Sequence, residues 1–282
     1  MPPDPVMPAE LRASQLNKYR ALWEFAHGIT DVRSIPANLQ MARSNLCNFK
    51  CVYCIDHREG NDIPRTRIEG DIWARLQQLI PRAESLAFHG ISEFMIDPGF
   101  FEIVGNCGTA RAALSINTNG SVCTPRHVEA LATYPGHLSM NFSLDAATPR
   151  TFLRIRGWDF VRVIRNIRTY VRRFSERRDS LWLSVSFVIT KSNVHEMTRF
   201  VYLAKGLGMD AVKYYRLHEY DRLDWQVTPK AGGVFDYRSE CTRHFAEEYD
   251  GQIERTRIAA EQVRIAIELP APLSEAERGE HA

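Results

Sequence analysis

Apolar and polar residues alternate with two different periods along this chain of 282 residues, and the pattern predicts short strands followed by longer helices. Over residues 9–27 the apolar positions recur near helical spacing, and Gly28 offers a stop, so one amphipathic helix is predicted there. Beyond this helix, strand and helix patterns repeat as far as residue 217. The predicted strands are residues 38–42, 86–89, 113–117, 138–144, 182–189 and 211–217, and the predicted helices are residues 70–80, 124–133, 160–174 and 194–206.

Strands that alternate with helices of this length imply right-handed, parallel β/α units. Six such units that close part-way give an α/β fold, a partial (β/α)6 TIM-like barrel with an N-terminal helix and a short C-terminal helical extension. We expect a tail and helix over residues 1–37, the barrel over residues 38–217, and a capping extension over residues 218–282. Within this extension we expect one long helix over residues 239–263 and a strand-like segment over residues 265–269. Ligands in such folds bind at the carboxyl ends of the strands.

Composition narrows the class of protein. The formal charge of +2 is too mild to indicate a nucleic-acid partner, and no stretch approaches the roughly 20 apolar residues that cross a bilayer. We therefore expect a soluble, cytoplasmic protein without a membrane or nucleic-acid partner. Three of the six cysteines are clustered, which is typical of metal ligands in a reducing compartment rather than of a disulfide framework.

The clustered cysteines are Cys47, Cys51 and Cys54, with the spacing C-x3-C-x2-C. Three thiolates on one short loop suit an iron–sulfur cluster or zinc. Structural zinc sites and complete cluster sites usually have four protein ligands, so three leave one metal position open. A non-catalytic zinc-binding module, with Cys107, Cys123 or a histidine as the fourth ligand, is the alternative from a different class.

This spacing resembles that of the radical S-adenosylmethionine (radical SAM) superfamily. The resemblance implies a 4Fe-4S cluster on the three cysteines, with S-adenosylmethionine (SAM) chelating the unique iron, and Tyr53 stands where the family places an aromatic residue against the adenine. It also implies an enzyme that reductively cleaves SAM to a 5'-deoxyadenosyl radical, which abstracts hydrogen from a substrate. A reductant such as flavodoxin or ferredoxin is the implied electron donor.

Two strand ends carry further matches. The segment Gly90-Ile91-Ser92-Glu93 resembles the family's Gly-Gly-Glu, with Ser92 in place of the second glycine and Ile91 extra, and implies that Glu93 contacts the amino group of SAM. Asn117 opens a turn similar to the family's Thr-Asn-Gly, which lies near ribose and substrate. The alternatives are a helix-capping role for Glu93 and a plain Asn-Gly turn.

The next matches resemble the SPASM and twitch branch of the superfamily. Ser143-Leu144-Asp145 followed by Arg156-Gly157 implies that Ser143 contacts the cofactor and that Arg156 binds the SAM carboxylate, with a surface role as the alternative for Arg156. The same resemblance places Asn193 and Tyr215 close to SAM or substrate.

Cys241 is the one cysteine after the predicted barrel, whereas SPASM and twitch domains carry several there, so we do not expect an auxiliary cluster. Radical epimerases of the superfamily return a hydrogen atom from a cysteine thiol. Cys241 is the candidate for that role, and simple packing is its alternative.

The substrate is predicted from the polar, aromatic loops at the strand ends and over residues 214–225. They suit a polar small molecule such as a sugar, an aminoglycoside or a nucleoside-like natural-product intermediate. Epimerisation, dehydrogenation, elimination and carbon–carbon bond chemistry all remain open as the reaction. A peptide-modifying enzyme, such as a RiPP maturase, is the second interpretation, although it would usually carry a leader-peptide domain and auxiliary cysteines.

Overall fold

A parallel sheet of seven strands lies at the centre of the computed structural model, which describes residues 12–55, 64–220, 225–275 and 277. The strands lie side by side in the order β1-β2-β3-β4-β5-β6-β9. Their bounds are β1 (Asn38–Gln40), β2 (Ser85–Phe88), β3 (Ala113–Thr118), β4 (Leu138–Ser143), β5 (Leu181–Ile189), β6 (Ala211–Arg216) and β9 (Ala266–Glu268). The strand-like segment predicted after the long helix is β9, which pairs with β6 and adds a seventh parallel strand to the six of the predicted barrel.

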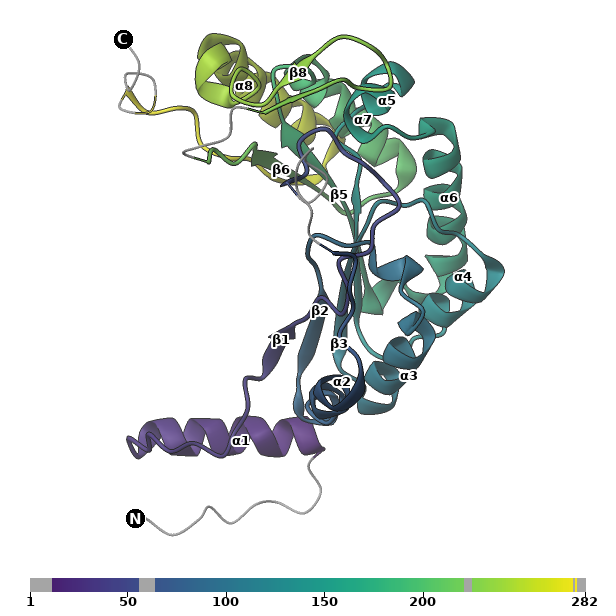
Figure 1. Ribbon diagram of the computed structural model, residues 1–282, viewed down its shortest axis with the longest axis vertical. Helices are drawn as coiled ribbons and strands as arrows, with labels where there is room; N and C mark the ends of the chain where they lie inside the picture. The colour runs from purple at the N-terminus through teal and green to yellow at the C-terminus, as the bar shows by residue number, and fades with distance from the viewer. Residues whose placement is uncertain (1–11, 56–63, 221–224, 276, 278–282) are drawn as a thin grey trace.

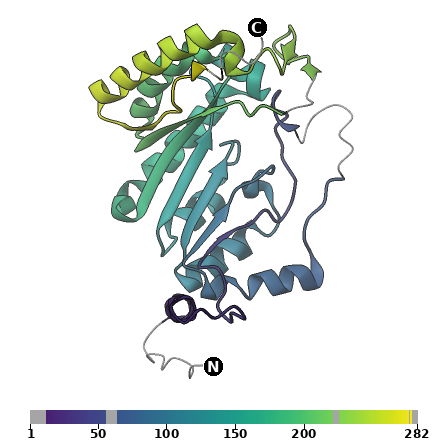
Figure 2. The same ribbon diagram turned by 90° about the vertical axis from the view of Figure 1, so that its left-hand side faces the viewer.

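Helices cover one side of this sheet. Figure 1 shows α3, α4, α6 and α7 along that side, while Figure 2 turns the opposite side towards the viewer. The helices are α1 (Ala13–Ala26), α2 (Gly70–Gln77), α3 (Phe100–Ala110), α4 (Pro125–Ala132), α5 (Pro149–Arg156), α6 (Phe160–Arg173), α7 (Met197–Leu207) and α8 (Ala246–Val263). None of the helices in the described residues is long and apolar enough to cross a membrane.

Shorter elements connect these helices and strands. Two short strands, β7 (Gln226–Val227) and β8 (Phe235–Asp236), pair antiparallel after β6. The 3-10 turns are η2 (Ile80–Arg82), η3 (Phe94–Ile96), η4 (Phe174–Ser180), η5 (Val194–Glu196) and η6 (Thr242–Phe245). The expected helix over residues 239–263 is shorter, because its first part is the turn η6.

Two helices were not predicted. Helix α3 contains Gly105 and Gly108, which weaken a helical pattern, and α5 is only 8 residues long. The local signals for α5 are nevertheless present: the Thr148 side chain accepts a hydrogen bond at the N-cap, Pro149 opens the first turn, and Gly157 takes the left-handed conformation at the C-cap. The Arg156-Gly157 match therefore marks the C-terminal end of α5.

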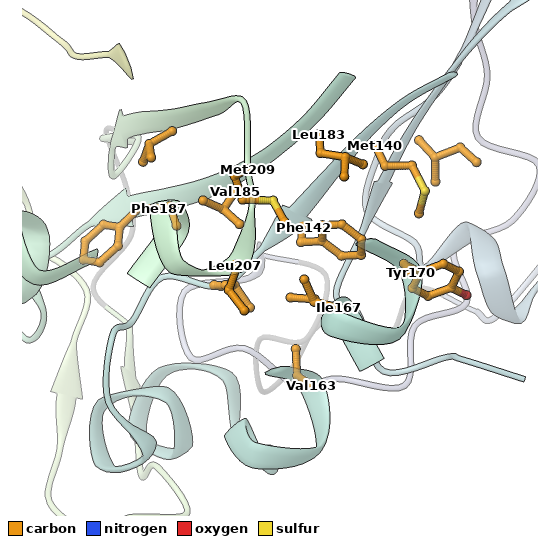
Figure 3. Packing of buried hydrophobic residues seen from close by; sticks show 14 of the residues in the cluster. Met140, Phe142, Val163, Ile167, Tyr170, Leu183, Val185, Phe187, Leu207 and Met209 are labelled. Carbon is orange, nitrogen blue, oxygen red and sulfur yellow. The ribbon is translucent and has the colours of Figure 1, made fainter. Parts of the chain in front are cut away.

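The core lies between the sheet and the helices. Alternate strand residues such as Met140, Phe142 and Val185 are fully buried against α6, which contributes Ile167 and Tyr170 (Figure 3). Each buried side chain of this size contributes roughly 1.5–3 kcal/mol. Because one face of each strand packs against this apolar layer, the other face points away from the helices.

The opposite face of the sheet is polar because residues alternate between the two faces of a strand. Strand register aligns Asn117 with Asn141 and Ser184, and aligns Ser186 with Lys213. We call this the inner face, and its polar rows run laterally from β3 to β9. It is therefore the face of the sheet that suits a polar ligand.

Candidate active site

A cavity of about 310 Å³ lies between the cysteine loop and the carboxyl ends of the strands. Cys47, Cys51 and Cys54 all line it. Six of the seven predicted cofactor contacts line the same cavity: Tyr53, Glu93, Asn117, Ser143, Arg156 and Tyr215. Residues far apart in the sequence are therefore brought to one wall by the parallel topology.

The cysteine loop is anchored from both sides. Asn48 donates to Ser121 Oγ at 2.9 Å and accepts from Asn119 Nδ2 at 2.9 Å, which ties the loop to the end of β3. Phe49 is buried and stacks on Trp158, with ring centroids 4.9 Å apart. These contacts hold the segment between the first two cysteines in one conformation.

The three thiols fit an iron–sulfur cluster by donor chemistry. They are soft ligands on one cavity wall, and among the described residues no fourth cysteine lines that wall. Burial raises the pKa of Cys47 and raises that of Cys51 to about 12, so metal loading releases protons from these thiols.

The partners required by the zinc alternative lie elsewhere. Cys107 lies on α3 and is buried in the core, and the Cys123 thiol lies 3.8 Å from the carbonyl oxygen of Asn166. Within the described residues, no three histidine, cysteine or acidic side chains surround a position for a single metal ion.

Glu93 joins two strand ends beneath the cavity. Its buried carboxylate accepts hydrogen bonds from Asn119 N at 2.6 Å, Thr118 Oγ1 at 2.8 Å and Met95 N at 3.2 Å. Burial raises the pKa of Glu93, and these donors oppose the shift. The bond to Met95 is the helix cap that was the alternative role for this residue, and the carboxylate also forms part of the cavity wall.

Asp145, the last residue of the Ser-Leu-Asp match, links three parts of the site. It is fully buried and left-handed, with φ of 58°, and its carboxylate accepts from Val188 N at 2.7 Å and from the Tyr53 hydroxyl. Arg156 Nε lies 2.5 Å from Asp145 Oδ2 as an ion pair, although this N–H is not aligned for a hydrogen bond. Asp145 thereby connects the cysteine loop, β5 and the end of α5.

Arg156 also contacts Cys51, one of the three predicted cluster ligands. Its Nη1 donates to Cys51 Sγ at 3.4 Å, and its guanidinium lies 5.8 Å from the centre of the Tyr53 ring. Burial opposes the charge, but Asp145 and its other neighbours keep the pKa of Arg156 above its usual value. The side chain expected to bind SAM is thus already engaged with the protein.

Asn193 is the predicted contact that does not line the cavity. It is fully buried, and its Nδ2 donates to the carbonyl oxygens of Asp145 and Val188, both at 2.9 Å. Its Oδ1 accepts from Thr190 N at 2.7 Å. In this structure Asn193 supports the Asp145 backbone and does not face the cavity.

Cys241 lies behind the cysteine loop. It is 2% exposed, packs in a cluster with Val52 and Ile155, and its thiol lies 3.4 Å from the Tyr237 carbonyl oxygen. Cys241 is not among the residues that line the cavity, and burial raises the pKa of its thiol to about 12. Its role as a hydrogen-atom donor stays a prediction.

Of the polar loop expected after β6, residues 221–224 lie outside the described residues.

Sequence reasoning missed two further buried carboxylates that hold the strand-end loops. Glu196 accepts from Ala147 N at 2.6 Å and Thr151 Oγ1 at 2.7 Å, and Glu240 accepts from Ser192 N at 2.6 Å. The available signal was a short polar segment after each strand, but it does not distinguish a structural carboxylate from a ligand contact.

A family model described as the Radical SAM superfamily matches residues 41–201. A probable GTP 3',8-cyclase from Saccharolobus islandicus is 26% identical over 191 residues, which cover 64% of this chain and 57% of the relative. A tungsten-containing aldehyde ferredoxin oxidoreductase cofactor-modifying protein from Pyrococcus furiosus is 24% identical over 239 residues, covering 81% and 59%. The chain therefore spans less than two thirds of the length of these curated relatives.

Solved structures share the fold. Streptococcus suis SuiB bound to S-adenosylmethionine aligns with a TM-score of 0.63 and 15% identity, over 92% of this chain and 55% of SuiB. The enzyme anSMEcpe, with bound AdoMet and the Kp18Cys peptide, aligns with a TM-score of 0.57 and 16% identity, over 83% of this chain and 64% of that one. These likenesses confirm the predicted α/β partial barrel.

Proposed function

Because this chain belongs to the radical SAM superfamily, whose enzymes use a 4Fe-4S cluster and S-adenosylmethionine, we propose that it abstracts hydrogen from a polar small molecule bound on the inner face. Cys47, Cys51 and Cys54 would hold the cluster. When bound, the cluster and SAM together supply a 5'-deoxyadenosyl radical. The protein's part is to orient the substrate at near contact and to exclude other reactive groups.

The polar inner face is the observation that carries this proposal. Ser143 and Ser186, which line the cavity, share a row with Lys213, whose Nζ lies 3.3 Å from Glu268 on β9. The Ser186 hydroxyl donates to Ser143 Oγ at 3.3 Å. Short polar side chains leave space above the sheet and offer hydrogen bonds, which a sugar or an amino-substituted molecule requires and an apolar substrate does not.

His89, which follows β2, and Ser115 on β3 add further polar groups. His89 Nε2 lies within hydrogen-bonding distance of Ser115 Oγ, at 3.0 Å, and burial together with the charge of Lys213 lowers the pKa of His89. A neutral imidazole and an ammonium on one face suit hydroxyl, phosphate or carboxylate groups of a substrate.

We therefore propose a sugar, an aminoglycoside or a nucleoside-like natural-product intermediate, modified by epimerisation, dehydrogenation, elimination or carbon–carbon bond chemistry. The similarity to proteins named GTP 3',8-cyclase supports the nucleoside-like member of this group. If the reaction is an epimerisation, Cys241 is our candidate for the thiol that returns hydrogen.

A peptide is the second candidate substrate. Two enzymes with the same partial barrel were solved with peptides: SuiB with its precursor peptide SuiA, and anSMEcpe with Kp18Cys. An extended polar face also suits a peptide backbone, since it offers donors and acceptors along its length.

Radical SAM enzymes need an external reductant, and we propose a flavodoxin or ferredoxin in the cytoplasm, where thiols stay reduced.

A substrate screen tests the proposal. The anaerobically reconstituted enzyme is given SAM, a reductant and one candidate at a time, and substrate-dependent formation of 5'-deoxyadenosine is followed together with the product. We expect a nucleoside, sugar or aminoglycoside to stimulate cleavage, and Lys213→Ala to raise the KM for that substrate. Lys205→Ala, on the exposed side of α7, is the matched control and leaves KM unchanged. Stimulation by peptides alone would transfer the assignment to the second candidate.

A further inference from the structure

Arg156 brings a positive charge into contact with a sulfur that would ligate the cluster. Its Nη1 lies 3.4 Å from Cys51 Sγ, and only 7% of the residue is exposed. Cys51 itself is buried, so water does not screen this contact well. An N–H donor of this kind, on a charged group, interacts more strongly with a thiolate than a neutral donor does.

Three other contacts keep the guanidinium in place. The neighbouring residues form a backbone hydrogen bond, from Val52 N to Ile155 O at 3.0 Å, which docks the end of α5 on the cysteine loop. Asp145 is the ion-pair partner of Arg156, and Tyr53 donates its hydroxyl to the same carboxylate. The donor is therefore preorganised in the described conformation and does not depend on a bound substrate.

We propose that Arg156 is a positioning residue that raises the reduction potential of the cluster through Cys51, and that Asp145 limits this effect. Reduction adds one electron from an external reductant to the cluster, and no bond to the protein forms or breaks. A nearby positive charge and a hydrogen bond to a ligand sulfur stabilise the reduced form, while a nearby carboxylate destabilises it. The inference needs the cluster but not the identity of the substrate.

The two charges predict shifts of opposite sign. Arg156→Met removes the cation and leaves the Asp145 carboxylate without its ion-pair partner, so the potential falls. Asp145→Asn removes the anion and leaves the cation, so the potential rises. At a fixed potential we expect Arg156→Met to lower the ratio of reduced to oxidised cluster at least about tenfold, which is about 59 mV for a one-electron couple.

The test is a redox titration of the anaerobically reconstituted holoenzyme, followed by electron paramagnetic resonance and performed without SAM. Arg156→Lys keeps the charge and should recover part of the wild-type potential. Arg154→Met is the matched control, because Arg154 lies on the same helix but donates to Ser192 and to the Gly232 and Val234 carbonyls. Its potential should equal that of the wild type.

Shifts of the same sign in Arg156→Met and Asp145→Asn would overturn the inference, because loosening of the loop would then explain both. An unchanged potential in Arg156→Met, with weaker binding of SAM, would also overturn it and favour the SAM carboxylate as the partner of Arg156. If Arg156→Met binds no iron, the sign of the Asp145→Asn shift decides, and a fall refutes the proposal. None of these outcomes depends on finding a substrate, so they are separate from failure of the proposed function.

Discussion

Gly99 leaves space for a buried ion pair at the root of the cysteine loop, and Gly99→Ala tests how much that pair stabilises the fold. A Cβ atom at Gly99 would lie 1.8 Å from Arg43 Nη1, which pairs with Asp97 Oδ1 at 2.7 Å. The φ of Gly99 is −86°, which any residue adopts, so backbone strain does not enter. The substitution acts through the displaced guanidinium alone.

The displaced guanidinium has little room, because it lies over the Trp73 ring, 4.8 Å from its centre, and is 11% exposed. Breaking a buried pair by removing one partner costs about 3–5 kcal/mol. We expect about 3 kcal/mol for Gly99→Ala, since Asp97 keeps its hydrogen bond from the amide of residue 99. For a chain of this size that lowers the unfolding midpoint by roughly 6–10 °C.

The assay is thermal and urea unfolding of the wild type, Gly99→Ala and a matched control, Gly105→Ala. Gly105 lies in the same helix, and a Cβ atom there would have nothing within 4 Å, so alanine should stabilise the protein by about 0.5–1 kcal/mol. In an Arg43→Met background, Gly99→Ala should cost much less, because the clash is gone. Equal stability of Gly99→Ala and wild type would contradict this prediction, and so would an unchanged cost of Gly99→Ala in the Arg43→Met background.

Three further outcomes follow from the described contacts. Asn193→Asp should cost about 2–3 kcal/mol in urea unfolding, because a carboxylate oxygen would replace the amide donor that faces the Asp145 carbonyl; wild-type stability would contradict this. With its pKa raised to about 12, Cys241 holds little thiolate at pH 8, so iodoacetamide should label it at least about a hundredfold more slowly in the native protein than in urea. Prompt native labelling at pH 8 would show that this thiol is accessible. Gly120→Ala should cost about 2 kcal/mol in thermal unfolding, since φ is 72° and a Cβ would lie 3.0 Å from Val163 Cγ1; an unchanged midpoint would argue against this packing.

The sequence was most informative about the polar residues at the carboxyl ends of the parallel strands. Because parallel strands end at one edge, polar residues at or after the ends of these strands were expected to meet. Glu93, Asn117, Ser143 and Tyr215 do line one cavity. The cysteine triplet by itself indicated either an iron–sulfur cluster or zinc, and the resemblance to the radical SAM superfamily then implied the cluster.

Features that depend on long-range geometry were not predictable in this way. Asn193 resembles the other strand-end polar residues, but the turn at Thr190 directs its amide into the protein. Asp145 gains its importance from a left-handed backbone and from partners on three distant segments. The local sequence pattern predicts neither the direction of a side chain nor its partners on distant segments. It also does not predict that β9 pairs with β6, because this pairing depends on the path of the preceding helix.

Formation of 5'-deoxyadenosine shows whether this protein carries out radical SAM chemistry at Cys47, Cys51 and Cys54. The protein is reconstituted anaerobically with iron and sulfide, reduced in the presence of SAM, and compared with a variant in which Cys47, Cys51 and Cys54 are alanine. Cys123→Ala is the matched control, because Cys123 is partly exposed but lies outside the cavity. We expect the wild type and Cys123→Ala to be brown and to form 5'-deoxyadenosine. The triple variant should be colourless and form no 5'-deoxyadenosine. A colourless wild type that binds zinc and makes no 5'-deoxyadenosine would contradict this expectation.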